Sequence, residues 1–181
     1  MRTLYILIAS SLDGYIAKPN DDLSFLKSVE KEGEDYGYAA FTATIDTIII
    51  GRKTYDWVQR EIGSTHYDNG QRDVYVITRS ARSAVGRTTF YRGSVPKLVE
   101  DLKSREGKNI YCDGGAEVIH ELLTNDLVDE LIVSIIPVLV GNGTRLFKDG
   151  RPEQELELLN TKTFDTGLTQ LHYKRKRNNT Q

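Results

Sequence analysis

The chain has 181 residues, of which 39% are hydrophobic and 28% are charged, as expected for one globular domain with its own core. A formal net charge of −2 argues against a nucleic-acid partner, and no apolar run approaches the roughly 20 residues that span a membrane. The single cysteine, Cys112, excludes an intrachain disulfide. We expect a cytoplasmic protein with one domain over residues 1–177 and a frayed tail at 178–181.

The first half of the chain alternates predicted strands and helices. Residues 3–9 form a continuous apolar run that predicts a buried strand, and the polar residues 10–22 predict a loop. Two helical patterns follow, at 23–32 and 35–45. The second of these places three apolar residues on one face, namely Tyr38, Phe41 and Ile45. The next predicted elements are a strand at 47–50, a helix at 53–60, a loop at 61–71 and strands at 74–78 and 88–91.

The second half continues the alternation and ends in a hairpin. Ser94 is a predicted N-cap, and the helix after it carries an apolar stripe. The remaining predicted elements are a strand at 109–112, a helix at 116–123, a strand at 129–136 and paired strands at 156–164 and 168–174. This order predicts an α/β fold with a mostly parallel central sheet, helices on both faces and a C-terminal antiparallel hairpin.

Parallel sheets bind ligands beyond the carboxyl ends of their strands, so the residues that follow each strand are candidates for a site. At 110–118 a strand meets Gly114 and Gly115 and then a helix. Glycine lets the backbone approach a phosphate closely, and a helix N-terminus offers free N–H groups. The alternative is a tight turn without a ligand, because the full G-x-G-x-x-G pattern is absent.

Three further strand ends carry polar residues. Gly51 is followed by Arg52, Lys53 and Thr54, and another predicted strand ends in Thr78, Arg79 and Ser80. Cations and hydroxyls beside helix starts suit a phosphate, although single arginines and lysines are commonly solvated surface charges. In the loop after the first strand, Asp13 precedes Gly14, which predicts either an Asp-Gly turn or a carboxylate beside a ligand.

Other kinds of site find little support. The histidines lie far apart in the sequence and lack neighbouring ligands, so we expect no metal. Cys112 falls in a strand and is expected to be a buried hydrophobe. The basic run 174–177 predicts a solvated, frayed tail rather than a nucleic-acid patch.

Taken together, these segments resemble the dihydrofolate reductase superfamily over nearly the whole chain. The segments at 48–55, 76–80 and 110–118 are similar, in order and spacing, to those that hold the phosphates of NADPH in that superfamily. Two more segments, at 11–17 and 128–141, resemble its branch of bacterial riboflavin-biosynthesis pyrimidine reductases. The resemblance is to the C-terminal reductase domain, standing alone.

The resemblance implies a homodimer that binds NADPH and reduces a small heterocycle related to 5-amino-6-(5-phosphoribosylamino)uracil. The implied cofactor-binding residues are Ala9, Ile16, Gly51, Arg52, Lys53, Thr54, Thr78, Arg79, Ser80, Asp113, Gly114, Gly115, Ala116, Glu117 and Val118. Candidates for catalysis are Asp13, Asp22 and Asp113, and candidates for substrate contact are Asp13, Tyr15 and Trp57.

The substrate side departs from the folate enzymes. Asp22 resembles their helical carboxylate but lies closer to the first strand, and a helix N-cap is the alternative role. The arginine that grips the folate tail has no counterpart in 61–72. A genuine dihydrofolate reductase and a non-catalytic NADPH-binding or interaction protein remain alternatives. We expect the apolar strand at 131–139 to form the dimer interface, and the alternative is that it is a central strand buried within the sheet.

Overall fold

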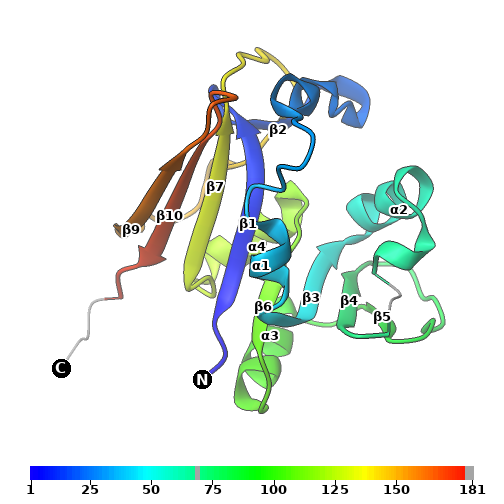
Figure 1. Cartoon of the computed structure of the whole chain (residues 1–181). Coiled ribbons are helices and arrows are strands. Elements are labelled where there is room, and N and C mark those ends of the chain that lie inside the picture. The colour runs from blue at the N-terminus through cyan, green and yellow to red at the C-terminus, as the bar shows by residue number, and fades with distance from the viewer. Residues whose placement is uncertain (68–69, 178–181) are drawn as a thin grey trace.

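The computed structural model describes residues 1–67 and 70–177, and these form a layered α/β fold around one large sheet (Figure 1). Among the described residues this sheet has eight strands, in the order β5-β4-β3-β6-β1-β7-β10-β9. The strands from β5 to β7 run parallel, and β10 and β9 are antiparallel additions at one side. The predicted fold class, with its mostly parallel sheet and C-terminal hairpin, is confirmed.

The strands have the following bounds: β1 Leu4–Ser11, β2 Tyr15–Ala17, β3 Ile45–Gly51, β4 Asp73–Ile77, β5 Thr88–Tyr91, β6 Asn109–Cys112, β7 Glu130–Ile136, β8 Thr144–Arg145, β9 Leu156–Thr163 and β10 Thr169–Arg175. The α-helices are α1 Tyr38–Thr42, α2 Arg52–Glu61, α3 Val95–Ser104 and α4 Ala116–Thr124. Three short 3-10 helices are η1 Pro19–Asp21, η2 Ser24–Val29 and η3 Ser64–His66.

The two largest of three hydrophobic cores among the described residues lie on the two faces of the sheet. α3 and α4 pack on one face, where Leu102, Ile119 and Leu122 are fully buried against β1 and β6. α1 and α2 cover the other face, where Tyr55 and Val58 meet the isoleucines of β3. The apolar stripes of the helices account for this layering, because each must bury one side. Ser94 caps α3 as predicted, accepting a hydrogen bond from the backbone N–H of Lys97.

The prediction was wrong about the region between β1 and β3. The expected helix at 23–32 is the shorter 3-10 helix η2, and the helix expected at 35–45 covers only α1. Gly37 precedes α1 with φ of 82°, a left-handed conformation that ends any helical run before it. Ile45 already belongs to β3, which is longer than predicted. The expected loop at 10–22 contains β2, which pairs with β8 in a separate small sheet.

The C-terminal residues also differ from expectation. Arg175 lies in β10 and pairs with Asp126 at 2.7 Å, and Arg177 pairs with Asp129 at 2.7 Å. The basic run is therefore held against the loop before β7 instead of being frayed, because two carboxylates lie beside it. The expected tail at 178–181 and part of the loop expected at 61–71 lie outside the described residues. None of the described helices is long and apolar enough to cross a bilayer.

The strand expected to form a dimer seam is internal. β7 is hydrogen-bonded to β1 on one side and to β10 on the other, and Leu131 and Ile136 are buried. Its edges are therefore paired within the chain, which agrees with the alternative interpretation of the 131–139 run. At the end of the described sheet lies β9, whose residues are all exposed.

Candidate functional site

Two strand ends meet in a contact so close that it requires glycine. β3 and β6 are neighbours, and the backbone N–H of Gly51 donates to the carbonyl of Gly114 at 2.7 Å. A Cβ on Gly51 would lie 3.3 Å from the Gly115 nitrogen, and one on Gly115 would lie 2.8 Å from Thr54 Oγ1. The two glycine segments are thus pressed together at the carboxyl edge of the sheet. We call this place the glycine crevice.

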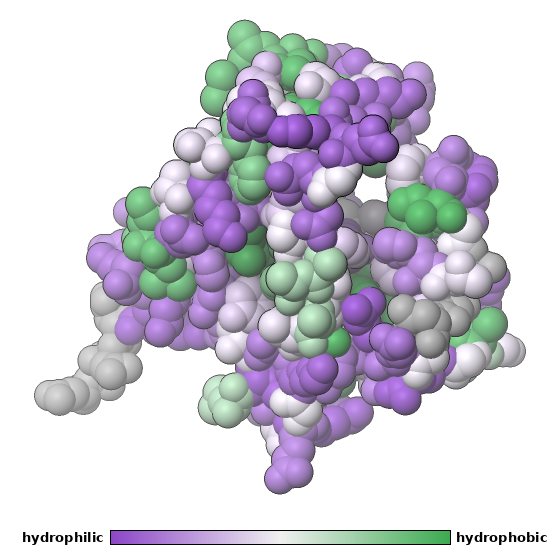
Figure 2. Space-filling view, viewed as in Figure 1, coloured by the Kyte–Doolittle hydropathy of each residue, from purple (hydrophilic) through white to green (hydrophobic). Residues whose placement is uncertain are grey.

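Two helices begin at the glycine crevice. α2 starts directly after Gly51 and α4 directly after Gly115, and neither N-cap glycine has a side chain to satisfy the first N–H groups. Free N–H groups and the positive ends of two helix dipoles favour an anionic group such as a pyrophosphate. Figure 2 shows an opening in the surface between the part of the molecule that holds α2 and the segments that hold η1 and η2.

A pair of arginines lies at the end of β5, one strand beyond β4. Arg52 and Arg82 both stand over the ring of Phe90, with guanidinium-to-centroid distances of 5.5 and 4.7 Å. Asp56 contacts both, at 2.6 Å from Arg52 and 3.8 Å from Arg82. Two cations share one carboxylate, which leaves net positive charge for a phosphate. Arg52 was predicted from the sequence, whereas Arg82 was not, because Arg82 lies in an irregular segment without strand or helix periodicity.

The other predicted cofactor residues differ in exposure and in contacts. Lys53, Arg79 and Ser80 are exposed, and the Thr78 side chain accepts from the backbone N–H of Ser80 at 3.1 Å.

Glu117, in the first turn of α4, pairs with Lys148 at 2.7 Å, and this contact lowers the pKa of Glu117. Ala116 and Val118 are buried. Ala9 and Ile16 are partly buried beside the cores.

A half-buried carboxylate with tyrosine partners adjoins the glycine crevice. Asp113 directly precedes Gly114, and its backbone N–H extends the β6–β3 pairing by donating to Ile49 at 3.0 Å. Tyr111 and Tyr67 both donate their hydroxyl protons to the Asp113 carboxylate. Burial raises the pKa of Asp113, and the two tyrosine hydrogen bonds oppose the shift only in part. A carboxyl group whose pKa is raised by burial is a candidate proton donor.

More tyrosines close this cluster. Burial and the nearby charge of Asp113 raise the pKa of Tyr38, at the start of α1, to about 12. The ring of Tyr67 stacks on that of Tyr55 at 6.0 Å, and His66 lies next to Tyr67. We call Asp113 with Tyr38, Tyr67 and Tyr111 the Asp113 cluster. Its tyrosines come from three separate segments. From the sequence, only Tyr111 could be predicted to lie near Asp113, because alternate residues of a strand such as β6 point to the same face.

The other two predicted acids are not in this cluster. Asp13 accepts hydrogen bonds from the backbone N–H groups of Val140 at 3.0 Å and Gly141 at 2.7 Å, and from Ser11 Oγ at 2.5 Å. The Ser11 bond is the largest cause that lowers the pKa of Asp13 to about 2. Asp22 is exposed and accepts from the Ser24 N–H at 2.7 Å, which lowers its pKa. Both carboxylates cap loops and hold no proton near neutral pH.

The role of Asp13 predicts an acid-dependent stability. A carboxyl whose pKa is lowered by folding stabilises the native state above its unfolded value near 4, and this contribution is lost as pH falls towards 2. We therefore expect Asp13→Asn to unfold more easily than the wild type at pH 6 and to approach it near pH 2. Urea unfolding between pH 2 and pH 6 measures the difference in stability between the variant and the wild type, with Asp21→Asn, at an exposed aspartate, as control. Parallel curves for the wild type and Asp13→Asn would contradict this role.

The two predicted substrate residues lie in different places. Trp57 is half-buried on α2, packed against the core on the α2 side of the sheet. Tyr15 is 9% exposed, its hydroxyl donates to the Gly141 carbonyl at 3.3 Å, and Arg145 stands over its ring at 5.0 Å. Tyr15 thus fixes the loop that Asp13 also holds. Among the described residues there is no group of three or more potential metal ligands.

The fold and the crevice together define the class of protein. The chain has a layered, mostly parallel sheet with the glycine crevice at its carboxyl edge. It belongs to the RibD C-terminal domain family, whose model matches residues 2–170. YwjB, an uncharacterized protein of Bacillus subtilis strain 168, is 37% identical over 175 residues, which cover 96% of this chain and 98% of YwjB.

Solved structures agree with this assignment. A protein from Shewanella sp. PV-4, provisionally named a riboflavin biosynthesis protein, is 28% identical with a TM-score of 0.87, and the match covers 97% of this chain and 99% of that one. The deaminase/5-amino-6-(5-phosphoribosylamino)uracil reductase of Thermotoga maritima matches with a TM-score of 0.71 and 15% identity. That match covers 97% of this chain and 57% of the Thermotoga chain, and it shows the shared fold.

Proposed function

We propose that this protein is an NADPH-dependent reductase that delivers a hydride and a proton to a C=N or C=O group of a small heterocycle. The single observation that carries the proposal is the position of Asp113, a carboxyl group with a raised pKa directly beside the glycine crevice. An anion site and a proton donor thus occupy neighbouring positions at one sheet edge. The reductase-like character of the family supports the same conclusion.

The residues present fit NADPH. Gly51 and Gly115 let the two strand ends pack closely, since a Cβ on either would press on atoms of the chain, and this brings together the starts of α2 and α4, whose N–H groups would bind the pyrophosphate. Arg52 and Arg82 would bind the 2′-phosphate, for which NADH has no counterpart. When bound, NADPH supplies the hydride, and the protein supplies orientation and the proton.

The residues of the Asp113 cluster have distinct roles in the proposed reaction. Asp113 in its protonated form donates the proton to the substrate, and the hydroxyls of Tyr67 and Tyr111 fix the direction of its carboxyl group. Half-buried Tyr38 offers a flat apolar surface that suits a heterocyclic ring, and the buried, stacked rings of Tyr55 and Tyr67 keep water away from the Asp113 cluster. A uracil derivative related to 5-amino-6-(5-phosphoribosylamino)uracil meets these requirements.

Removing one member of the arginine pair is expected to weaken NADPH binding selectively. Arg82→Ala removes a cation from the proposed 2′-phosphate site, so we expect Kd for NADPH to rise about tenfold, or about 1.4 kcal/mol. Kd for NADH is expected to change little. Calorimetric titration measures both, with Arg60→Ala as matched control because Arg60 pairs only with Glu61 among the described residues. Equal losses for the two nucleotides would contradict the assignment.

Turnover tests the proposal and its alternatives together. We expect NADPH to be oxidised in the presence of 5-amino-6-(5-phosphoribosylamino)uracil, with the ribitylamino product identified by mass spectrometry. A genuine dihydrofolate reductase would instead oxidise NADPH with dihydrofolate and bind antifolates tightly. A non-catalytic binding protein would bind NADPH and oxidise it with neither substrate. The last two outcomes would each replace the proposed function.

We also propose that two copies associate through the apolar first half of β9, residues 156–159, rather than through β7. β9 ends the described sheet and exposes Leu156, Leu158 and Leu159, which are 38%, 53% and 45% exposed. An end strand with exposed apolar side chains is a ready partner for a second copy. Light scattering of the wild type and of Leu158→Lys tests this: we expect a dimer and a monomer, respectively, and a monomeric wild type would contradict it.

A further inference from the structure

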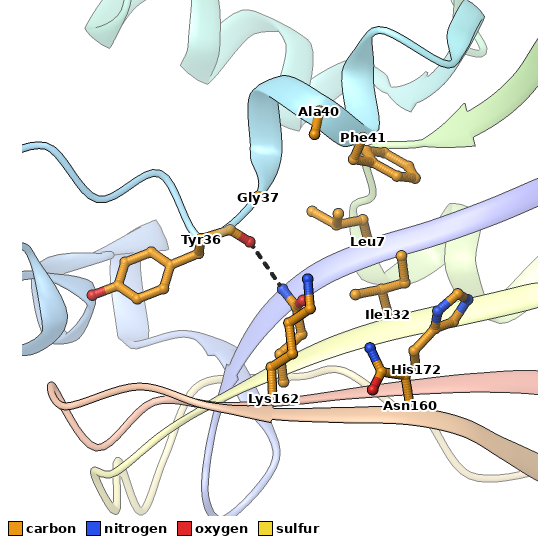
Figure 3. Close-up of a pocket in the computed structure, with 10 residues that line it drawn as sticks. Leu7, Tyr36, Gly37, Ala40, Phe41, Ile132, Asn160, Lys162 and His172 are labelled. Atoms are coloured by element: carbon orange, nitrogen blue, oxygen red, sulfur yellow. Dashed lines mark hydrogen bonds between the residues drawn. The ribbon is translucent and has the colours of Figure 1, made fainter.

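A cavity of about 210 Å³ lies on the sheet face beneath α1, apart from the glycine crevice (Figure 3). Leu7 and Ile132, from β1 and β7, form its apolar floor, and Ala40 and Phe41 form the wall on α1. Polar side chains from the C-terminal hairpin line the opposite wall, namely Asn160, Lys162, Gln170 and His172. We call this the sheet-face cavity. It has an apolar base with polar groups gathered at one side, as small-molecule sites do.

The sheet-face cavity is separated from the Asp113 cluster by two aromatic rings. Phe41 lines the cavity and packs edge-on against Tyr111, with ring centroids 5.3 Å apart. The hydroxyl of Tyr111 points to Asp113. A molecule in the cavity therefore meets one side of this ring pair, while Asp113 lies on the other. The proposed function uses none of the polar residues of the cavity.

The polar wall contains groups that are engaged and groups that are available. His172 Nε2 lies 2.7 Å from Glu130 Oε2, and the amide nitrogen of Gln170 donates to Ser134 Oγ at 3.1 Å and to the Tyr36 carbonyl at 3.4 Å. Lys162 and Asn160 make no side-chain hydrogen bond or ion pair with any residue in the described part of the chain. In Figure 3 Asn160 lies beside His172, and Lys162 lies farther along β9.

We propose that the sheet-face cavity binds a small organic carboxylate with a flat apolar body. The ammonium group of Lys162 and the amide of Asn160 would bind the carboxylate, and Leu7, Ile132 and Phe41 would cover the apolar part. Glu130, the acid that contacts the polar wall, is engaged by His172 and Tyr5, and none of the ion pairs among the described residues involves Lys162. A volume of about 210 Å³ limits the ligand to a small molecule with one ring.

Benzoate is a suitable probe, and its binding can be followed by NMR of the backbone amides without any nucleotide. We expect saturable shifts at the amides of Gly37, Phe41 and Ile132. Lys162→Gln should raise Kd about tenfold, the loss of one charge-assisted contact. Lys97→Gln is the matched control, because Lys97 is exposed on α3, and its Kd should equal that of the wild type. Benzyl alcohol, which lacks the carboxylate, should bind more weakly than benzoate.

A second pair of variants tests the location. Ala40→Phe places a ring in the cavity from α1 and should abolish the shifts, whereas Ala39→Phe, exposed on the same helix but outside the lining, should retain them. The proposal is overturned by the absence of saturable shifts at the lining residues, by equal Kd values for Lys162→Gln and Lys97→Gln, or by shifts confined to Gly114 and its neighbours. Because no NADPH is present, these outcomes are independent of the reductase activity.

Discussion

Asp113→Asn is expected to lower kcat about 10²- to 10⁴-fold, the usual contribution of a positioned proton donor. Asparagine keeps the shape of the side chain and can still accept from Tyr67 or Tyr111, but it has no acidic proton. NADPH affinity should stay close to that of the wild type, because the glycine crevice is formed by the backbone of the next residues. Steady-state kinetics and a nucleotide titration on the same preparation separate the two effects.

The pH profile gives an independent readout of the same group. Since burial raises the pKa of Asp113, the wild-type rate should fall as pH rises through that raised value and the proton is lost. The variant should lose this limb of the profile. Asp22→Asn is the comparison, because Asp22 is exposed and caps Ser24. A wild-type rate in Asp113→Asn, or a loss confined to Asp22→Asn, would contradict the assignment of the proton donor.

Gly143→Ala is expected to lower the free energy of unfolding by about 3 kcal/mol. A Cβ at this position would lie 2.0 Å from the carbonyl oxygen of Ala17 and 2.9 Å from the Cα of Lys18, and both are backbone atoms that cannot move alone. The φ of Gly143, +140°, also disfavours any other residue. The clash falls where β2 meets β8, so the loop after β1 would separate from the 138–145 segment.

Gly141→Ala is the matched control for this variant. Gly141 also has a positive φ, +78°, but no atom lies within 4 Å of a Cβ built there. We expect Gly141→Ala to lower the free energy of unfolding only by the cost of holding alanine in a left-handed conformation, about 1–2 kcal/mol. Urea unfolding of both variants and the wild type measures the difference. Equal destabilisation by the two substitutions would show that close packing against Ala17 does not determine the effect.

Much of the fold could be predicted because its signals are local. The apolar runs of β1, β3 and β7 and the stripes of α3 and α4 each follow from a few neighbouring residues. The region between β1 and β3 could not, since its short 3-10 helices and the β2–β8 sheet depend on contacts with a segment over 120 residues away. Asp13 shows the same effect, because its partners Val140 and Gly141 are distant in sequence.

The candidate site was predictable only in part. Strand ends and glycines placed Gly51, Gly114 and Gly115 together, because parallel neighbours end at one edge of the sheet. Arg82 and Tyr67 lie in irregular segments, where no periodicity indicates the direction of a side chain. Their roles follow from three-dimensional contacts with Phe90 and Asp113.

The most direct test of the central claim is a calorimetric titration of the purified protein with NADPH and with NADH. The glycine crevice and the arginine pair predict one NADPH site per chain, with micromolar Kd and a clear preference over NADH. Gly51→Val, which places side-chain atoms against Gly115 and Val118, should abolish that binding. Absence of binding of either nucleotide to the wild type would contradict the assignment of this edge of the sheet as a cofactor site.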